Sequence, residues 1–256
     1  MATQPDAETL GSAPDPRLLV LGPVTLLGAR GTKPDRSPTA ALECCGWLLR
    51  HPGQSSLTMT QSMLVAEGTR RSNLSRLRLW LGQNNEGIAY LPEARTGHIR
   101  LHPSVTSDWE TLELLVIGGP EGASDEKLIA ALHLVRGVPV STSAPAQWHW
   151  ARSWRDEMVN TVRHIGLVLC ERAVAHRDWQ LARWAIAQAL LAAPDDEPLL
   201  VALLRTEQAA GNAAESERIA YRIARLARAN DTILSEATIA LLHQAIGLPA
   251  TSTPSA

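Results

Sequence analysis

The stretch Arg71-Ser-Asn-Leu-Ser-Arg-Leu-Arg-Leu-Trp-Leu-Gly82 decides the first half of the fold. Its leucines recur at helical spacing and predict a buried stripe, and Gly82 is a typical helix stop. At 100° per residue, Arg71, Ser75 and Arg78 fall within about 60° of one another on a different face. The sequence therefore predicts a short helix over 71–81 with an apolar side and a basic side.

Two more helices and a pair of strands are expected before this helix. Ser37-Pro38 is typical of a helix start, with serine at the N-cap and proline at the first helical position. A second helix is expected over 57–66, ending at Gly68. Residues 17–27 form a Leu/Val run interrupted by Gly22-Pro23, which predicts two short strands joined by a turn.

A hairpin is expected after the basic helix. Residues 88–91 and 98–101 alternate at a period of two, and the turn between them contains Pro92 and Gly97. The order of strands, three short helices and a hairpin is that of a winged helix-turn-helix, with Arg95 at the tip of the wing.

The chain beyond Ser107 has a helical period throughout, and we expect it to be entirely helical. Helices are predicted near 147–175, 178–192, 197–210, 213–229 and 232–246. Asp178 and Asn212 each follow a helix and lie 34 residues apart, which is the tetratricopeptide period. The same offset pairs Leu167 with Val201, Leu169 with Leu203, Ala175 with Ala209, and Ala189 with Ile223. The aromatic signature positions are mostly absent, so the repeat is degenerate.

The sequence thus predicts an α+β chain with two folded domains. A winged helix-turn-helix is expected over 17–104 and an all-α, tetratricopeptide-like array of helical hairpins over 105–247. The Pro- and Asp-rich residues 1–16 are expected to be a disordered leader, and residues 248–256 a disordered tail.

Arginines are concentrated in the expected DNA-binding half. Residues 68–100 contain six arginines against two glutamates, so this segment carries +4 in a chain of formal charge −2. Arginine reads guanine O6 and N7 in the major groove, and arginines at a wing contact phosphate or the minor groove. The residues predicted to contact duplex DNA are Arg71, Ser75, Arg76, Arg78, Arg95 and Arg100. The alternative is a solvated arginine-rich face that binds nothing.

Other classes of protein lack support in the sequence. The net charge of −2 gives no global attraction to nucleic acid or membrane, and no apolar run approaches the ~20 residues of a membrane helix. Cys44, Cys45 and Cys170 form no CxxC pair, which favours reduced thiols in the cytoplasm. The sequence has no GK[ST], GxSxG or HExxH, so we expect neither an enzyme nor a cofactor or metal site.

Several stretches, in the same order, resemble the antibiotic-regulatory activators of actinomycetes. Leu18–Leu26, Leu48-Leu-Arg-His-Pro-Gly53 and Leu74–Gly82 resemble their winged helix. The part from Ser107-Asp-Trp109, through Ala131–Pro139, to about Gly247 resembles the bacterial transcriptional activator domain that follows it. The resemblance implies a transcriptional regulator whose helical hairpins contact RNA polymerase, another partner or a second copy.

Two short stretches also resemble a subgroup of this family. Tyr90-Leu-Pro and Val105-Thr-Ser-Asp-Trp109 are similar to members in which the module forms the C-terminal end of large membrane- or peptidoglycan-associated proteins. The second hypothesis is therefore a protein-interaction module, part of such a protein, whose winged helix does not bind DNA.

Overall fold

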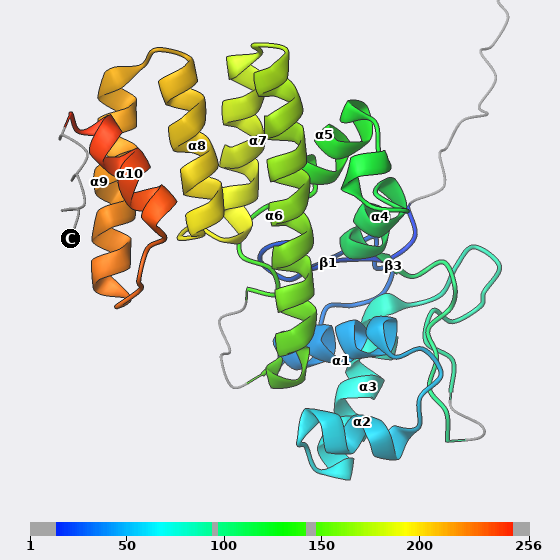
Figure 1. Ribbon diagram of the computed structural model, residues 1–256. Helices are drawn as coiled ribbons and strands as arrows, with labels where there is room; N and C mark the ends of the chain where they lie inside the picture. The colour runs from blue at the N-terminus through cyan, green and yellow to red at the C-terminus, as the bar shows by residue number, and fades with distance from the viewer. Residues whose placement is uncertain (1–13, 94–96, 142–146, 248–256) are drawn as a thin grey trace, which may run out of the picture. The chain divides into compact units, whose positions relative to one another are not determined.

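The computed structural model describes residues 14–93, 97–141 and 147–247 (Figure 1). In these ranges the chain is an α+β structure with ten α-helices and one small sheet. The described residues fall into two compact units. Of the described residues, the first unit draws on 14–20, 24–93, 97–108 and 147–151, and the second on 21–23, 109–141 and 152–247. Among the described residues, the two units differ from the predicted boundary at 104/105 in the short segments 21–23, 105–108 and 147–151.

The sheet of the first unit has three short strands in the order β2-β1-β3. Its strands are β1 (Arg17–Leu19), β2 (Thr25–Leu27) and β3 (Thr106–Ser107). β1 pairs antiparallel with β2, which confirms the two predicted strands. β3 pairs parallel with β1, although the sequence predicts helix from this point on. The buried Asp108 accepts a hydrogen bond of 2.7 Å from the amide of Val20 just after β1.

Three helices pack in the first unit: α1 (Pro38–Arg50), α2 (Ser56–Met63) and α3 (Glu67–Leu81). α1 begins at the predicted residue, but Ser37 lies in the left-handed region at φ 55° and its side chain caps no amide. α2 is shorter than predicted because Leu64 takes a left-handed conformation at φ 50°, which ends the helix. α3 is longer than predicted, and Gly68 lies in its first turn instead of ending α2.

The predicted hairpin over 88–91 and 98–101 does not form in the described residues. Neither segment is a strand, and each makes only an isolated bridge elsewhere, Ala89 with Gln83 and His98 with Ser55. The amide of His102, just after the second segment, donates to the carbonyl of Tyr90 in the first segment at 2.8 Å. The segment is nevertheless packed, since Tyr90 and Leu91 are fully buried. Its side chains, more than a β-ladder, hold it in place.

Residues 14–16, which the sequence assigns to the leader, belong to the folded part. The carboxylate of Asp15 accepts a 2.5 Å hydrogen bond from the Tyr90 hydroxyl and pairs with Arg30 at 3.3 Å. Burial and this hydrogen bond raise the pKa of Tyr90 to about 12. The rest of the leader, the tail over 248–256 and Arg95 lie outside the described residues.

Helices form almost all of the second unit. Most of the residues of α4 (Asp108–Leu115) belong to it, together with 3-10 helix η1 (Pro120–Gly122) and α5 (Asp125–His133). The long predicted helix begins at Arg152, because residues 149–151 form the separate 3-10 helix η2 (His149–Ala151) of the first unit. The remaining helices match the prediction closely: α6 (Arg152–Ala175), α7 (Trp179–Ala192), α8 (Glu197–Ala209), α9 (Ala213–Ala229) and α10 (Glu236–Ala245).

The second unit is not entirely helical, contrary to the prediction. Pro23 forms an isolated parallel bridge with Ser141, whose amide donates to Gly22 at 3.1 Å. Gly22 has φ +149°, and a Cβ there would lie 3.0 Å from Cβ of Arg136. Close backbone approach at this glycine therefore lets the 21–23 segment join the second unit.

Successive helices of this unit pack as neighbouring hairpins, α6 with α7 and α8 with α9 (Figure 1). The 34-residue offset recurs in the two turns. Arg177 and Gly211 both have positive φ, and the next residue in each turn, Asp178 or Asn212, donates its amide to the carbonyl of Ala173 or Glu207. The burial agrees in part: Ala189 and Ile223, a predicted pair, are both buried, whereas Leu169 is buried and its predicted partner Leu203 is half-buried. The turns of the two hairpins thus share one register.

Candidate nucleic-acid interface

Helix α3 is held by its apolar side and by one loop. Leu74, Leu77 and Leu81 are buried, as the sequence predicts. The amides of residues 30–32 donate to the carbonyls of residues 79–81 at 2.9–3.2 Å. A Cβ on Gly31 would lie 1.8 Å from the carbonyl oxygen of Leu79, so only glycine fits there. These contacts fix which side of α3 faces solvent.

The outer side of α3 is an exposed stripe running from its first turn to its last. The exposed residues of this stripe, which we call the α3 outer face, are Gly68, Arg71, Ser72, Ser75 and Leu79. Leu79 is 68% exposed although it is apolar. Ser72 and Leu79 are not among the residues that sequence reasoning singled out. The helical angle that grouped Arg71 with Ser75 also places Ser72 and Leu79 within about 100° of Arg71.

Arg71 is the most accessible of the predicted DNA-binding arginines on α3. Its side chain is 72% exposed and forms an ion pair with Glu67 one turn earlier. An exposed pair at this spacing contributes only about 0.3–0.5 kcal/mol to stability, so a phosphate or base could replace Glu67 as its partner. Ser75 lies one turn further on the same face and is exposed.

Arg78 is committed to the protein's own backbone. Its Nε donates to the carbonyl of Leu91 at 2.9 Å, and a terminal nitrogen donates to the carbonyl of Pro92 at 3.5 Å. The side chain is half-buried and joins α3 to the segment where the hairpin was predicted. These hydrogen bonds connect α3 to that segment, and they engage the guanidinium that would otherwise reach a base.

Arg76 and Arg70 lie away from the centre of the outer face. Arg76 is half-buried and donates to the Asn73 side chain at 3.1 Å. Arg70 is 7% exposed and lies on the apolar side, as its helical angle indicates. Arg100 is exposed, and its guanidinium lies over Gly53, where a Cβ would be 2.7 Å from it. The structure thus brings Arg71 and Ser75 together on one face, with Arg76 and Arg78 at its two edges.

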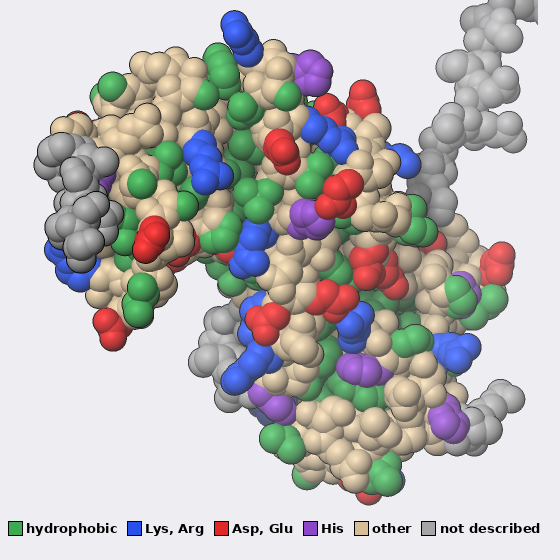
Figure 2. All heavy atoms as spheres, in the orientation of Figure 1, with side chains coloured by type: hydrophobic (Ala, Val, Ile, Leu, Met, Phe, Trp, Pro, Cys, Tyr) green, Lys and Arg blue, Asp and Glu red, His purple; other side chains and the backbone are tan. Residues whose placement is uncertain are grey.

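The second unit presents a mixed surface. Figure 2 shows acidic, basic and histidine side chains interspersed over its helices, without an extended patch of one sign among the described residues of the face in view. On α9, Arg218 pairs with Glu215 and Arg222 donates to the carbonyl of Pro194 at 2.7 Å. Both arginines are thus engaged by groups of the second unit itself.

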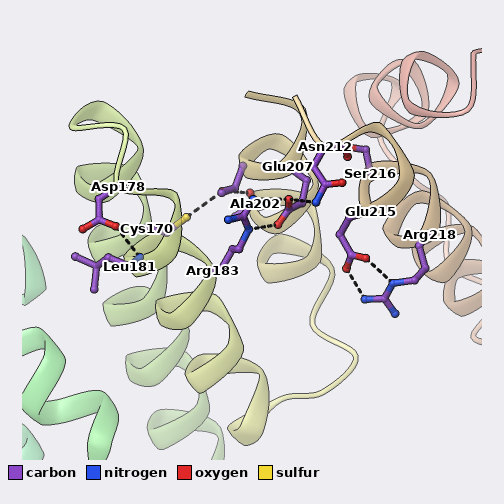
Figure 3. A network of polar contacts seen from close by, with 11 residues as sticks. Cys170, Asp178, Leu181, Arg183, Ala202, Glu207, Asn212, Glu215, Ser216 and Arg218 are labelled. Carbon is purple, nitrogen blue, oxygen red and sulfur yellow. Dashed lines mark hydrogen bonds and ion pairs between the residues drawn. The ribbon is translucent and has the colours of Figure 1, made fainter. Parts of the chain in front are cut away.

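Polar groups also join the helices of this unit from within. Arg183 on α7 pairs with the buried Glu207 on α8, and Asn212 donates to the same carboxylate at 3.1 Å (Figure 3). Cys170 and Thr206 meet at 3.5 Å in the same region. Cys44, Cys45 and Cys170 are buried and form no disulfide, and burial raises the pKa of the Cys44 and Cys170 thiols, which disfavours thiolate chemistry.

Comparison with solved structures identifies a neighbour with the same fold. The chain superposes on EmbR of Mycobacterium tuberculosis, solved in complex with a low-affinity phosphopeptide, with a TM-score of 0.62 at 17% sequence identity. The match covers 93% of this chain and 66% of the EmbR chain, so this chain spans less than two thirds of that protein. No protein-family model matches the sequence, and no curated protein matches it. Within the described residues, no helix has the length and hydrophobicity to span a bilayer.

Proposed function

We propose that this chain is a DNA-binding transcriptional regulator and that it is not an enzyme. The observation that carries the proposal is the α3 outer face, where Arg71, Ser72 and Ser75 are exposed opposite a buried leucine stripe. An exposed helix with arginine and serine at its N-terminal half is the arrangement that helix-turn-helix proteins use in the major groove. The EmbR-like fold is compatible with this assignment.

In this proposal residues 17–104 are a winged helix-turn-helix, with α3 as its recognition helix. Arg71 and Ser75 contact base edges or phosphates, and Ser72 adds a hydroxyl beside them. Arg100 and Arg95 contact the phosphate backbone from the wing segment. Arg76 and Arg78, at the edges of the face, orient the helix and its neighbouring segment more than they read bases. Leu79, exposed on the same face, is suited to a thymine methyl group.

Residues 105–247 are then a tetratricopeptide-like partner domain. The shared register of α6–α7 and α8–α9 at the 34-residue offset supports this reading. Helical hairpin arrays bind proteins through their extended surfaces, so we assign this domain to contact with RNA polymerase, another protein or a second copy. A regulator of this kind acts in the cytoplasm, where the three free thiols are stable.

A fluorescence-anisotropy titration of the whole chain with random-sequence duplex DNA, over a series of salt concentrations, tests the proposal. We expect the logarithm of the association constant to fall linearly with the logarithm of the salt concentration. Arg71→Gln should weaken binding, whereas Arg225→Gln, which removes an exposed arginine from α9 of the second unit, should leave it unchanged. Folded protein with no duplex affinity at low salt would overturn the proposal.

One observation favours the second candidate, a protein-interaction module of a larger assembly. Three of the predicted DNA-binding arginines already have protein partners: Arg71 has Glu67, Arg76 has Asn73, and Arg78 has two carbonyls. A null result in the same titration, with the chain shown to be folded, would select this candidate.

A further inference from the structure

A polar cavity lies within the first unit, on the side of α3 that borders its outer face at Arg76. It has a volume of about 400 Å³. Residues of α1, of α2 with the turn after it, of α3 and of the segment at η2 line it. Its polar lining includes Glu43, Asn73, Arg76, Gln147 and His149.

The wall from η2 is fixed to α1 by a buried carboxylate. Glu43 is 4% exposed, and its Oε1 accepts from the Trp148 amide at 2.7 Å and from the Trp150 indole at 3.2 Å. Trp148 is 1% exposed and packs on Gly46, where a Cβ would lie 2.4 Å from its ring. The cavity is therefore bounded by well-packed elements.

Two opposite charges line this cavity without pairing. Glu43 on α1 has no arginine or lysine partner, and Arg76 on α3 has only the neutral Asn73, among the residues the structure describes. Burial of a carboxylate is unfavourable and raises the pKa of Glu43, and the hydrogen bonds from Trp148 and Trp150 and the charge of His149 offset this only in part. A bound cation would remove this penalty, and a bound anion would satisfy the guanidinium.

Further unsatisfied polar groups belong to the same walls. Oε1 of Gln147 is buried and accepts no hydrogen bond in the described structure. Asn73 is 4% exposed, and its side-chain oxygen accepts a hydrogen bond from Arg76 at 3.1 Å. The cavity therefore offers acceptors at Glu43 and Gln147 and donors at Arg76 and Asn73.

We propose that this cavity binds a small zwitterion of the α-amino-acid class. The ammonium group is held by Glu43 and Gln147, and the carboxylate by Arg76 and Asn73. Met63, Leu64 and Val65, at the end of α2, supply an apolar wall for a side chain. The site is distinct from the proposed contacts with bases, because its α3 residues, Asn73 and Arg76, are not part of the outer face, although Arg76 lies at its edge.

Isothermal titration calorimetry on the whole chain, without DNA, tests the site. Each proteinogenic L-α-amino acid is titrated separately, and we expect saturable binding of at least one of them at one site per chain. For that amino acid, the matching amine without the carboxylate and the matching acid without the amine should each bind at least about tenfold more weakly. Since no DNA is present, failure here leaves the proposed regulator function standing.

Variants locate the binding. Arg76→Gln and Glu43→Gln should each weaken the affinity by at least about tenfold, and Gln at position 43 keeps an acceptor for Trp148 and Trp150. Arg71→Gln removes a charge from the outer face of the same helix and should leave the affinity unchanged. The proposal is overturned if the folded chain binds no amino acid, or if Arg76→Gln binds as tightly as the unchanged protein.

Discussion

Arg183 and Glu207 form a two-bond ion pair between α7 and α8, although the carboxylate is 2% exposed. Nε and a terminal nitrogen of Arg183 donate to the two oxygens of Glu207 at 2.6 and 2.8 Å (Figure 3). Asn212, at the start of α9, donates to the same carboxylate at 3.1 Å. One buried charge thus joins the second helix of one hairpin to both helices of the next.

We expect Arg183→Gln to destabilise the second unit by about 2 kcal/mol, because it leaves the Glu207 carboxylate buried without its cation. The value lies below that for a fully buried pair, since Arg183 is 41% exposed. Chemical denaturation of the whole chain, followed by helical circular dichroism, measures it. The matched control is Arg218→Gln, which breaks the exposed pair with Glu215 and should change stability by under about 0.5 kcal/mol. Equal effects of the two substitutions would contradict the structural role given to Glu207.

Gly166 lies where α6 and α7 pack closely against each other. A Cβ there would lie 2.6 Å from Cβ of Ala189. Gly166→Ala should force the helices apart and destabilise the chain by about 1–3 kcal/mol, despite alanine's better helix propensity. Gly68→Ala is the control, because Gly68 is also helical and a Cβ there meets no atom within 4 Å. That change should be neutral or stabilising by up to about 1 kcal/mol, and thermal melts of both variants would show the opposite signs.

The helices were predictable from the sequence because each carries its own apolar stripe. The leucines of α3 and the 34-residue match between α6–α7 and α8–α9 depend on local spacing alone. The strand β3 was not predictable, because two residues, Thr106 and Ser107, carry no periodicity and pair with β1 some 90 positions away. The segment 88–101 was wrongly predicted to be a hairpin, because Tyr90, Leu91, Ile99 and Leu101 are buried by tertiary packing and form no ladder.

The candidate site was predictable only in part. Helical angles placed Arg71 and Ser75 on one exposed face, and the same angles include Ser72. The partners of Arg76 and Arg78 could not be foreseen, because Leu91 and Pro92 reach α3 only through the tertiary fold. Gln147 and Glu43 are about 100 residues apart, so no local pattern brings them to one cavity.

Glu43 should give the chain a defined pH dependence of stability. Burial raises its pKa above the ordinary value of 4.5. Between that value and the folded-state pKa, the folded chain keeps a proton on Glu43 that the unfolded chain has lost. The contribution of Glu43 to the free energy of unfolding is therefore fully present below about pH 4.5, and it is lost as the pH rises through the folded-state pKa. Glu43→Gln cannot titrate and should gain stability relative to the unchanged protein as the pH rises above 4.5. Urea denaturation of both proteins at several pH values measures the difference, in which contributions of groups common to both, including nearby His149, largely cancel.

The stability difference between these two proteins could instead be independent of pH or change in the opposite direction. Either result would show that burial does not raise the pKa of Glu43. Leu77→Ala provides a comparison of another kind, since it removes a fully buried apolar side chain. That substitution should cost about 2–5 kcal/mol at every pH in the series, because no titration is involved.

Arg78 distinguishes a structural arginine from a base-reading one. Arg78→Lys keeps the charge but loses the planar fork that reaches the carbonyls of Leu91 and Pro92. We expect a loss of about 1 kcal/mol in stability, and faster amide hydrogen exchange over 88–93 because that segment loses its tie to α3. Duplex affinity should fall equally for a sequence selected from a random pool and for its scrambled form. Arg71→Lys, at a 72% exposed site, should leave melting and exchange unchanged. If Arg78→Lys instead spares stability and exchange and weakens only the selected duplex, by about 1–3 kcal/mol, Arg78 reads a base and its contacts with the carbonyls break on binding.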